Sequence, residues 1–292
     1  MKLPSRDPAA EKSFHPEESA ALEIISKAPA APRPAPPLLF VHGAWHGAWC
    51  WDEGFLDYFA ERGFAAHALS LRAHGASPGK LRTTRIRDYV EDVARAVATL
   101  PSAPVLVGHS MGGFVVQKYL ETHSAPAAVL LASVPPRGAR GIAIRATRGQ
   151  PLDVLKCNLT LSLRPLISDV GRARRLLFSE AAPEETVRRS FSRLQDEAWF
   201  AYLDTLLFDL VRPERVTAPI IVMGGGDDAM VRPAEVIATA KAYRVKPTIL
   251  AGVAHDMMLD LGWRRVAGAM ARELERYFPN VRRSPPPQSN AA

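Results

Sequence analysis

Cysteine is scarce in this sequence, with only Cys50 and Cys157 among 292 residues. Two thiols cannot build a disulfide framework, so we expect a reducing compartment and ordinary buried thiols. The first 35 residues are polar and rich in alanine and proline, and they lack the apolar core of a signal peptide. No run approaches the roughly 20 apolar residues that a membrane span requires. These absences predict a cytoplasmic protein with no integral membrane segment.

Nucleic-acid binding also lacks a basis in the sequence. The formal net charge is +7, from 37 Lys and Arg against 30 Asp and Glu. A nucleic-acid site would need basic residues clustered with aromatic side chains or within a known motif, and neither is present. We therefore predict no nucleic-acid partner. With 47% apolar residues the chain can bury a large core, either as one α/β domain with an insertion or as two small domains.

Strand-like and helix-like segments alternate along most of the chain. Strands are predicted at residues 38–41, 64–71, 105–107, 127–134, 219–223 and 247–252, and helices at 55–62, 86–100, 114–122, 234–243 and 263–278. Such alternation predicts an α/β fold with a mostly parallel central sheet flanked by helices. The core is expected in two parts, residues 38–136 and 216–280.

Three segments depart from this alternation. Residues 1–37 form a Pro/Ala-rich extension, in which Leu22-Glu23-Ile24-Ile25 either adds an edge strand or only docks. Residues 281–292 are predicted to be a disordered tail. Between the two parts of the core, residues 137–215 have helical segments without a convincing strand. Catalytic loops lie at the carboxyl edge of a parallel sheet, so an insertion there is predicted to be a helical lid.

The segment from Val105 to Gly113 combines a strand-like run, a Gly-x-Ser-x-Gly motif and the start of a helix. This order is typical of a nucleophile elbow, in which the serine projects from a sharp strand-to-helix turn. The turn presses the residues two before and two after the serine together, and Gly108 and Gly112 satisfy that requirement. Ser110 is therefore the predicted nucleophile.

A serine nucleophile needs a base, and the base needs an acid that holds its tautomer. His255 follows the last predicted strand and is the candidate base. Asp227 and Asp228 follow another strand through three glycines, and one of them is the candidate acid while the other makes a turn. The turn at His42-Gly43 is expected to aim the N–H of Ala44 at the serine. Together with the N–H of Met111 it would form the oxyanion hole.

The other histidines near these motifs are given structural roles. His42 is expected to hold its turn, and His109 to pack beside the nucleophile. His46 and three tryptophans, Trp45, Trp49 and Trp51, form either one wall of a pocket or a core cluster.

Four segments together resemble the α/β-hydrolase superfamily. They are Val41–Trp49, Gly108–Gly112, Gly225–Asp228 and Ala254–Asp256, and the resemblance covers roughly residues 38–279. The H-G-x-x-x-G-A-W form is similar to the branch that holds plant methyl-ester esterases and hydroxynitrile lyases. The resemblance implies the α/β-hydrolase fold, and its G-x-x-D spacing from Gly225 points to Asp228 as the acid, ahead of Asp227. Lyases of that branch typically carry threonine in place of Gly43 and lysine in place of Asp256, so both residues favour a hydrolase.

The sequence thus predicts a serine hydrolase that cleaves a small-molecule carboxylic ester or thioester through an acyl-enzyme. No metal or organic cofactor is implied, because side chains and backbone complete the chemistry. Two alternatives remain: other chemistry on the same fold, such as C–C bond hydrolysis or hydroxynitrile cleavage, and a non-catalytic ligand-binding role. The oligomeric state is not predicted.

The predicted lid is strongly basic at its beginning. Nine basic residues face only Asp153 and Asp169 between residues 137 and 175. They are Arg137, Arg140, Arg145, Arg148, Lys156, Arg164, Arg172, Arg174 and Arg175. This surface is either a solvated basic face or a means of steering an anionic substrate toward Ser110.

Overall fold

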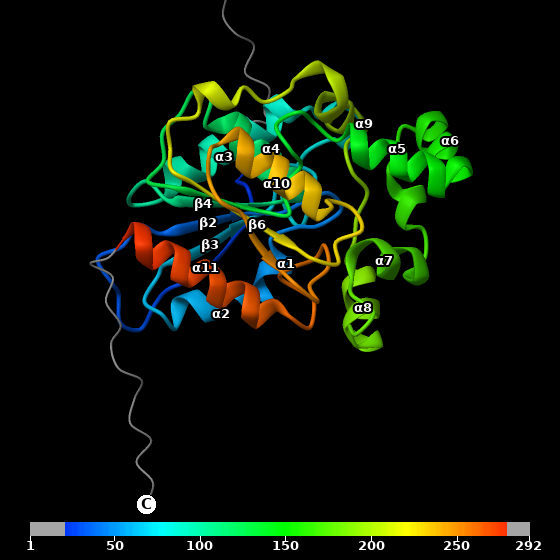
Figure 1. Cartoon of the computed structure of the whole chain (residues 1–292). Helices are drawn as coiled ribbons and strands as arrows, with labels where there is room; N and C mark the ends of the chain where they lie inside the picture. Colours follow the sequence, from blue (N-terminus) through cyan, green and yellow to red (C-terminus); the bar gives the residue numbers. More distant parts are fainter. Residues whose placement is uncertain (1–20, 279–292) are drawn as a thin grey trace, which may run out of the picture.

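The computed structural model describes residues 21–278, and within them seven strands form one sheet (Figure 1). The strands are β1 (Ile24–Lys27), β2 (Leu38–Val41), β3 (Ala66–Leu69), β4 (Val105–His109), β5 (Ala128–Leu131), β6 (Ile220–Gly225) and β7 (Thr248–Leu250). Their order across the sheet is β1-β3-β2-β4-β5-β6-β7. All neighbouring pairs are parallel except β1 with β3. The prediction of a mostly parallel sheet is confirmed.

The edge strand β1 comes from the segment whose role the sequence left open. Ile24 pairs with Leu69 and Lys27 with Ala66 in an antiparallel register. Just before β1, Glu23 accepts hydrogen bonds from the Ser70 hydroxyl at 2.5 Å and from the Ala76 amide at 3.1 Å. Part of the predicted extension is therefore integral to the sheet.

Two layers of helices cover the sheet. One face carries α1 (Trp49–Asp52), α2 (Phe55–Ala60) and α11 (Trp263–Tyr277), and the other carries α3 (Ile86–Thr99), α4 (Ser110–Tyr119) and α10 (Pro233–Ala242) (Figure 1). Alternate residues of β2 serve the two layers, with Phe40 facing the first and Leu39 the second. The buried residues of a parallel strand read as a continuous apolar run for this reason.

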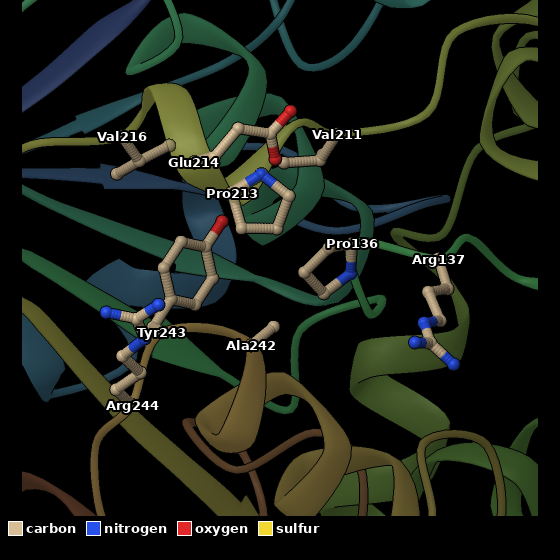
Figure 2. Close-up of a pocket in the computed structure, with 9 residues that line it drawn as sticks. All are labelled: Pro136, Arg137, Val211, Pro213, Glu214, Val216, Ala242, Tyr243 and Arg244. Carbon is tan, nitrogen blue, oxygen red and sulfur yellow. The ribbon is translucent and has the colours of Figure 1, made fainter.

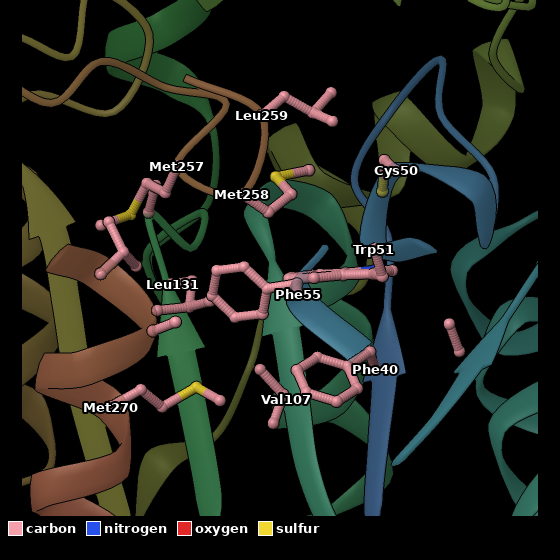
Figure 3. Packing of buried hydrophobic residues seen from close by; sticks show 14 of the residues in the cluster. Phe40, Cys50, Trp51, Phe55, Val107, Leu131, Met257, Met258, Leu259 and Met270 are labelled. Atoms are coloured by element: carbon pink, nitrogen blue, oxygen red, sulfur yellow. The ribbon is translucent and has the colours of Figure 1, made fainter. Parts of the chain in front are cut away.

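Aromatic, aliphatic and methionine side chains pack together in the first layer (Figure 3). The ring of Phe40 lies 4.9 Å from that of Trp51 and 6.0 Å from that of Phe55, measured between centroids. All three side chains are fully buried. Large aromatic side chains bury the most apolar area per residue, so these three rings contribute strongly to the core.

A helical insertion separates β5 from β6. It contains α5 (Arg140–Gly149), α6 (Pro151–Thr160), α7 (Val170–Leu177), α8 (Glu184–Phe191) and α9 (Trp199–Leu203), and α5 to α8 gather beside the sheet (Figure 1). Among the described residues the insertion adds no strand to the sheet, and its only β feature is an isolated bridge between Ser162 and Ala198. We propose residues 137 and 215 as its limits. The predicted tail at 281–292 lies outside the described residues.

The end of the insertion is attached to the core through Asp204. Its carboxylate accepts hydrogen bonds from the Ile86 amide at 3.1 Å and from the Arg85 guanidinium at 2.5 and 3.1 Å. This contact satisfies the free N–H at the start of α3. As for membrane spans, none of the helices between residues 21 and 278 is long and apolar enough to cross a bilayer.

Candidate active site

Ser110 lies at the junction of β4 and α4 with a backbone φ of 51°. Positive φ is unfavourable for a residue with a side chain, and such strain persists where the surrounding structure imposes it. The glycines of the motif allow the close approach. A Cβ on Gly108 would lie 2.6 Å from the Cα of Gly113, and one on Gly112 would overlap the carbonyl oxygen of His42. The packing thus requires glycine at both positions, as the sequence motif predicted.

The structure brings Ser110, His255 and Asp228 into one hydrogen-bonded chain. His255 Nε2 lies 2.9 Å from Ser110 Oγ, and His255 Nδ1 lies 2.8 Å from Asp228 Oδ2. A carboxylate only accepts, so Nδ1 carries the proton and Nε2 is free to accept the serine hydroxyl. The second oxygen of Asp228 accepts from the amides of Met230 and Val231 at 2.7 and 2.8 Å. Asp228 is therefore fixed in place before any substrate arrives.

Asp227, the second candidate for the acid, lies elsewhere. It is exposed, while Asp228 is buried. The Asp227 amide donates to the carbonyl of Val253 at 3.0 Å, which helps to hold the turn. The geometry favours Asp228 as the partner of His255.

The environment of His255 raises its pKa. Burial opposes the charged imidazolium, but the Asp228 carboxylate outweighs that effect, and the charge of Asp256 adds to it. A proton taken from Ser110 would therefore be held more strongly than by a histidine in water.

Ala44 and Met111, the predicted oxyanion donors, both line the same pocket as Ser110. Met111 is the second residue of α4, so its N–H has no acceptor within the helix. Gly43 keeps the loop close to the nucleophile, because a Cβ there would lie 2.9 Å from the Cβ of Ser110. The two backbone segments thus both lie close to Ser110.

His42 holds the turn that leads to Ala44. Its Nε2 accepts from the Leu71 amide at 3.0 Å, so its Nδ1 carries the proton and donates to the Gly43 carbonyl at 2.8 Å. Burial lowers the pKa of His42 well below the usual range, in agreement with a neutral ring. This arrangement agrees with the structural role predicted for His42.

His109 supports the loop of His255. Its Nε2 lies 2.9 Å from the carbonyl oxygen of His255 and donates to it. Burial, together with the nearby His255, lowers the pKa of His109 to about 3, so the ring is neutral. His109 therefore supports the loop of His255, in agreement with the packing role expected for it.

His46 and Asp256 form a buried pair that the sequence did not predict. His46 Nε2 donates to Asp256 Oδ2 at 3.1 Å, and His46 Nδ1 donates to the Ala44 carbonyl at 2.8 Å. Burial opposes the charge of Asp256, but His46 outweighs it, and the pKa of Asp256 is lowered. All three tryptophans belong to one buried core cluster, and Trp45 also lines the pocket. Trp49 stacks on His46 with centroids 5.4 Å apart.

A second buried network joins the insertion to the loop of Ala44. Glu197, which precedes α9, accepts from the Tyr89 hydroxyl at 2.6 Å and from the Trp45 amide at 3.4 Å. The Glu197 carboxylate also accepts from the Ala198 amide at 2.6 Å and lies 3.4 Å from His74. Burial opposes the charged form of His74, but the carboxylate outweighs burial and raises the pKa of His74. The Trp45 carbonyl accepts from the Gln195 amide at 2.8 Å. Both backbone groups of Trp45 are thus held by the insertion.

The cavity at Ser110 is small and apolar, with a volume of about 60 Å³. The insertion supplies much of its lining, namely Ala139, Ile142, Ala143, Ala146, Leu163, Leu166, Tyr202 and Thr205. A larger cleft of about 600 Å³ lies around Tyr243 and Arg244 and includes none of the predicted catalytic residues (Figure 2). The smaller cavity is the candidate active site because Ser110 lines it.

Residues 38–269 match the model of the alpha/beta hydrolase family. Norfluorocurarine synthase 2 from Strychnos sp is 34% identical over 103 residues, which are 34% of this chain and 38% of that protein. Probable esterase PIR7A from Oryza sativa subsp. indica is 35% identical over 113 residues, or 36% of this chain and 42% of that protein. The matched segments thus span less than half the length of these relatives.

Among solved structures, a monoacylglycerol lipase from Paleococcus ferrophilus superposes with a TM-score of 0.66. The alignment covers 88% of this chain and 100% of the lipase, at 20% sequence identity. At that identity the likeness concerns the fold, and it agrees with a parallel sheet flanked by helices.

Proposed function

Since the chain belongs to the alpha/beta hydrolase family, we propose that it is a serine hydrolase that cleaves carboxylic esters through an acyl-enzyme. The observation that carries the proposal is the 2.9 Å contact between Ser110 Oγ and His255 Nε2, with Asp228 behind the histidine. Similarity to an esterase supports ester hydrolysis as the reaction.

In the proposed reaction Ser110 Oγ attacks the carbonyl carbon of the ester while its proton passes to His255 Nε2. The oxygen of the tetrahedral intermediate carries the negative charge, which the N–H groups of Ala44 and Met111 stabilise. Asp228 stabilises the imidazolium. The intermediate collapses, His255 returns the proton to the leaving alcohol, and the acyl group remains on Ser110. A water molecule, deprotonated by His255, then releases the acid and restores the serine.

The pocket indicates the kind of substrate. Its lining from the insertion is almost entirely apolar, and about 60 Å³ of space is available. The part of the substrate bound there is therefore expected to be small and apolar. Because α5 and α9 provide this lining, we propose that the insertion acts as the lid that selects the substrate.

The decisive experiment combines a fluorophosphonate probe with p-nitrophenyl esters of increasing acyl length. We expect covalent labelling at Ser110, and hydrolysis that is fastest for short acyl chains. Labelling at another residue, or turnover that persists in a Ser110→Ala variant, would contradict the mechanism. Analysis of products from a cyanohydrin and from a C–C substrate would expose the two alternative chemistries.

The cysteines support the proposal that the protein works in the cytoplasm. Cys50 and Cys157 are both free and buried. Burial raises the pKa of Cys157 to about 11, so its thiolate is scarce at neutral pH.

A further inference from the structure

Helix α6 turns its leucines away from the protein. Leu152, Leu155 and Leu159 are 72%, 54% and 75% exposed. Their spacing of three and four residues places them on one face of the helix. The residues that α6 buries are Asp153 and Cys157. The usual arrangement of an amphipathic helix on a globular protein is therefore inverted.

An ion pair fixes this orientation. Asp153 Oδ2 lies 2.9 Å from a guanidinium nitrogen of Arg172 on α7. A rotation of α6 that buried its leucines would expose Asp153 and break this pair. The price of removing one partner from a mostly buried ion pair is high. The exposed leucines are thus a stable feature of the fold.

The same surface carries positive charge. Lys156 lies one turn beyond Leu152 and Arg148 lies near the end of α5, and both are exposed. Residues 140–160 contain four basic residues and one acidic residue, the buried Asp153. Ile144 on α5 adds a further apolar side chain that is 51% exposed. The α5–α6 surface (Ile144, Arg148, Leu152, Leu155, Lys156 and Leu159) is therefore apolar and cationic, without an exposed carboxylate of its own.

We propose that the α5–α6 surface docks on an anionic phospholipid bilayer. Leucines that enter the boundary between headgroups and acyl chains, beside basic side chains that face anionic headgroups, are the features of an interfacial helix. A second copy of the chain fits less well. A two-fold contact through this face would bring Arg148 and Lys156 toward their own counterparts, with no carboxylate between residues 140 and 160 free to offset them.

The α5–α6 surface lies close to the cavity of Ser110. The opposite side of α5 contributes Ile142, Ala143 and Ala146 to the cavity of Ser110. A bilayer on the outer face would therefore lie one helix away from the active site. This proposal concerns binding and does not depend on the proposed esterase reaction.

The test uses the full chain and sedimentation with vesicles. Vesicles of phosphatidylcholine with phosphatidylglycerol are compared with vesicles of phosphatidylcholine alone. We expect binding to the anionic vesicles, weakened by salt, and weaker by at least about tenfold in a Leu152→Ser/Leu155→Ser/Leu159→Ser variant. The matched control is Ile237→Ser/Ile249→Ser/Leu261→Ser, which replaces three apolar residues that are 38–63% exposed elsewhere.

Two further measurements keep the outcome clear. Thermal unfolding and hydrolysis of a soluble ester should be unchanged in the leucine variant, because these side chains neither pack in the core nor line the cavity. An Arg148→Gln/Lys156→Gln variant should bind anionic vesicles less and with a smaller salt dependence. Equal vesicle binding by the leucine variant and the wild type would overturn the proposal. The proposal would also be overturned if the wild type did not bind vesicles and instead formed a dimer that the leucine variant abolishes.

Discussion

His46 Nε2 lies 3.1 Å from Asp256 Oδ2, although the two residues are 210 positions apart in the chain. The contact joins the loop of Ala44 to the residue that follows His255. The other oxygen of Asp256 has no hydrogen-bond partner among the described residues. One buried ion pair therefore holds together two loops that carry different parts of the proposed reaction, and its carboxylate also acts on His255.

Replacing Asp256 by Asn should shift the pH dependence of hydrolysis. The reaction needs neutral His255, so kcat/KM falls as the pH drops through the raised pKa of that residue. Asp256 contributes to raising this pKa, and its removal should move the acidic limb to lower pH. A pH profile of kcat/KM measures the shift. Glu185→Gln, at an exposed position, is the control, and an acidic limb that moves to higher pH would contradict the prediction.

Ser110→Ala should abolish both ester turnover and fluorophosphonate labelling. Removal of a catalytic serine costs on the order of 10⁴–10⁶-fold in rate. The substitution removes only the hydroxyl from a residue that is already accommodated at φ 51°, so the fold should persist. Circular dichroism checks the fold, and intact-protein mass spectrometry checks the labelling. A labelled alanine variant would show that the nucleophile is elsewhere.

Asp228→Asn should lower kcat by about 10⁴-fold, because the amide stabilises the wrong tautomer of His255. Asp227→Asn is the matched control one position away. It is exposed and should change kcat by no more than about threefold, as expected for a surface substitution. Steady-state kinetics of both variants measure the difference. The reverse ranking would assign the acid to Asp227.

Gly43→Thr should reduce ester hydrolysis without creating a hydroxynitrile lyase. A Cβ at this position would lie 2.9 Å from both Ser110 Cβ and His109 Nδ1, so the nucleophile or the His109 ring must move. We expect a loss in kcat/KM of about 100-fold, as for a displacement of roughly 1 Å at a catalytic group. Gly149→Thr is the control, because a Cβ there meets nothing within 4 Å. Cyanide release from a cyanohydrin would show that the threonine alone changes the chemistry.

Steering of an anionic substrate by the basic segment remains a prediction. Several of its side chains are in ion pairs, Arg145 with Glu235, Arg172 with Asp153 and Arg174 with Glu184. Lys156 lies 3.8 Å from Asp153, so the exposed Arg148 and Arg175 are the better candidates. Their replacement by Gln should flatten the salt dependence of kcat/KM for an acyl-CoA relative to a neutral ester. Equal salt dependence for the two substrates in the wild type would contradict steering and would favour the interpretation of a solvated basic face.

The sequence predicted what short-range patterns determine. Apolar runs between turns marked six of the strands, and the glycines around Ser110 marked the turn because the packing admits no larger side chain there. The position of His255 after the last strand, and the resemblance that pointed to Asp228, named two side chains that lie 2.8 Å apart in the structure, and their catalytic roles stay a prediction. That placement works because parallel strands end at one edge of the sheet.

Contacts between residues far apart in the chain could not be predicted from the sequence. β1 has four residues and is half-exposed, so its apolar pattern is too short to distinguish a strand from a docked segment. The partners of His46 and Glu197 come from distant segments, and no local pattern relates them. The orientation of α6 depends on Asp153 meeting Arg172 from another helix, while helical spacing alone would equally allow its leucines to face inward.

The attachment of Trp45 to Gln195 and Glu197 bears on how this protein can be altered. Many insertions can be exchanged between related proteins as independent modules, because few bonds cross their boundary. Here an exchange of residues 137–215 would remove the acceptor of one Trp45 backbone group and the donor to the other. The neighbouring Ala44 would lose its support in the same step. In a chimaera, the 195–197 segment and the loop of Trp45 should therefore be exchanged together.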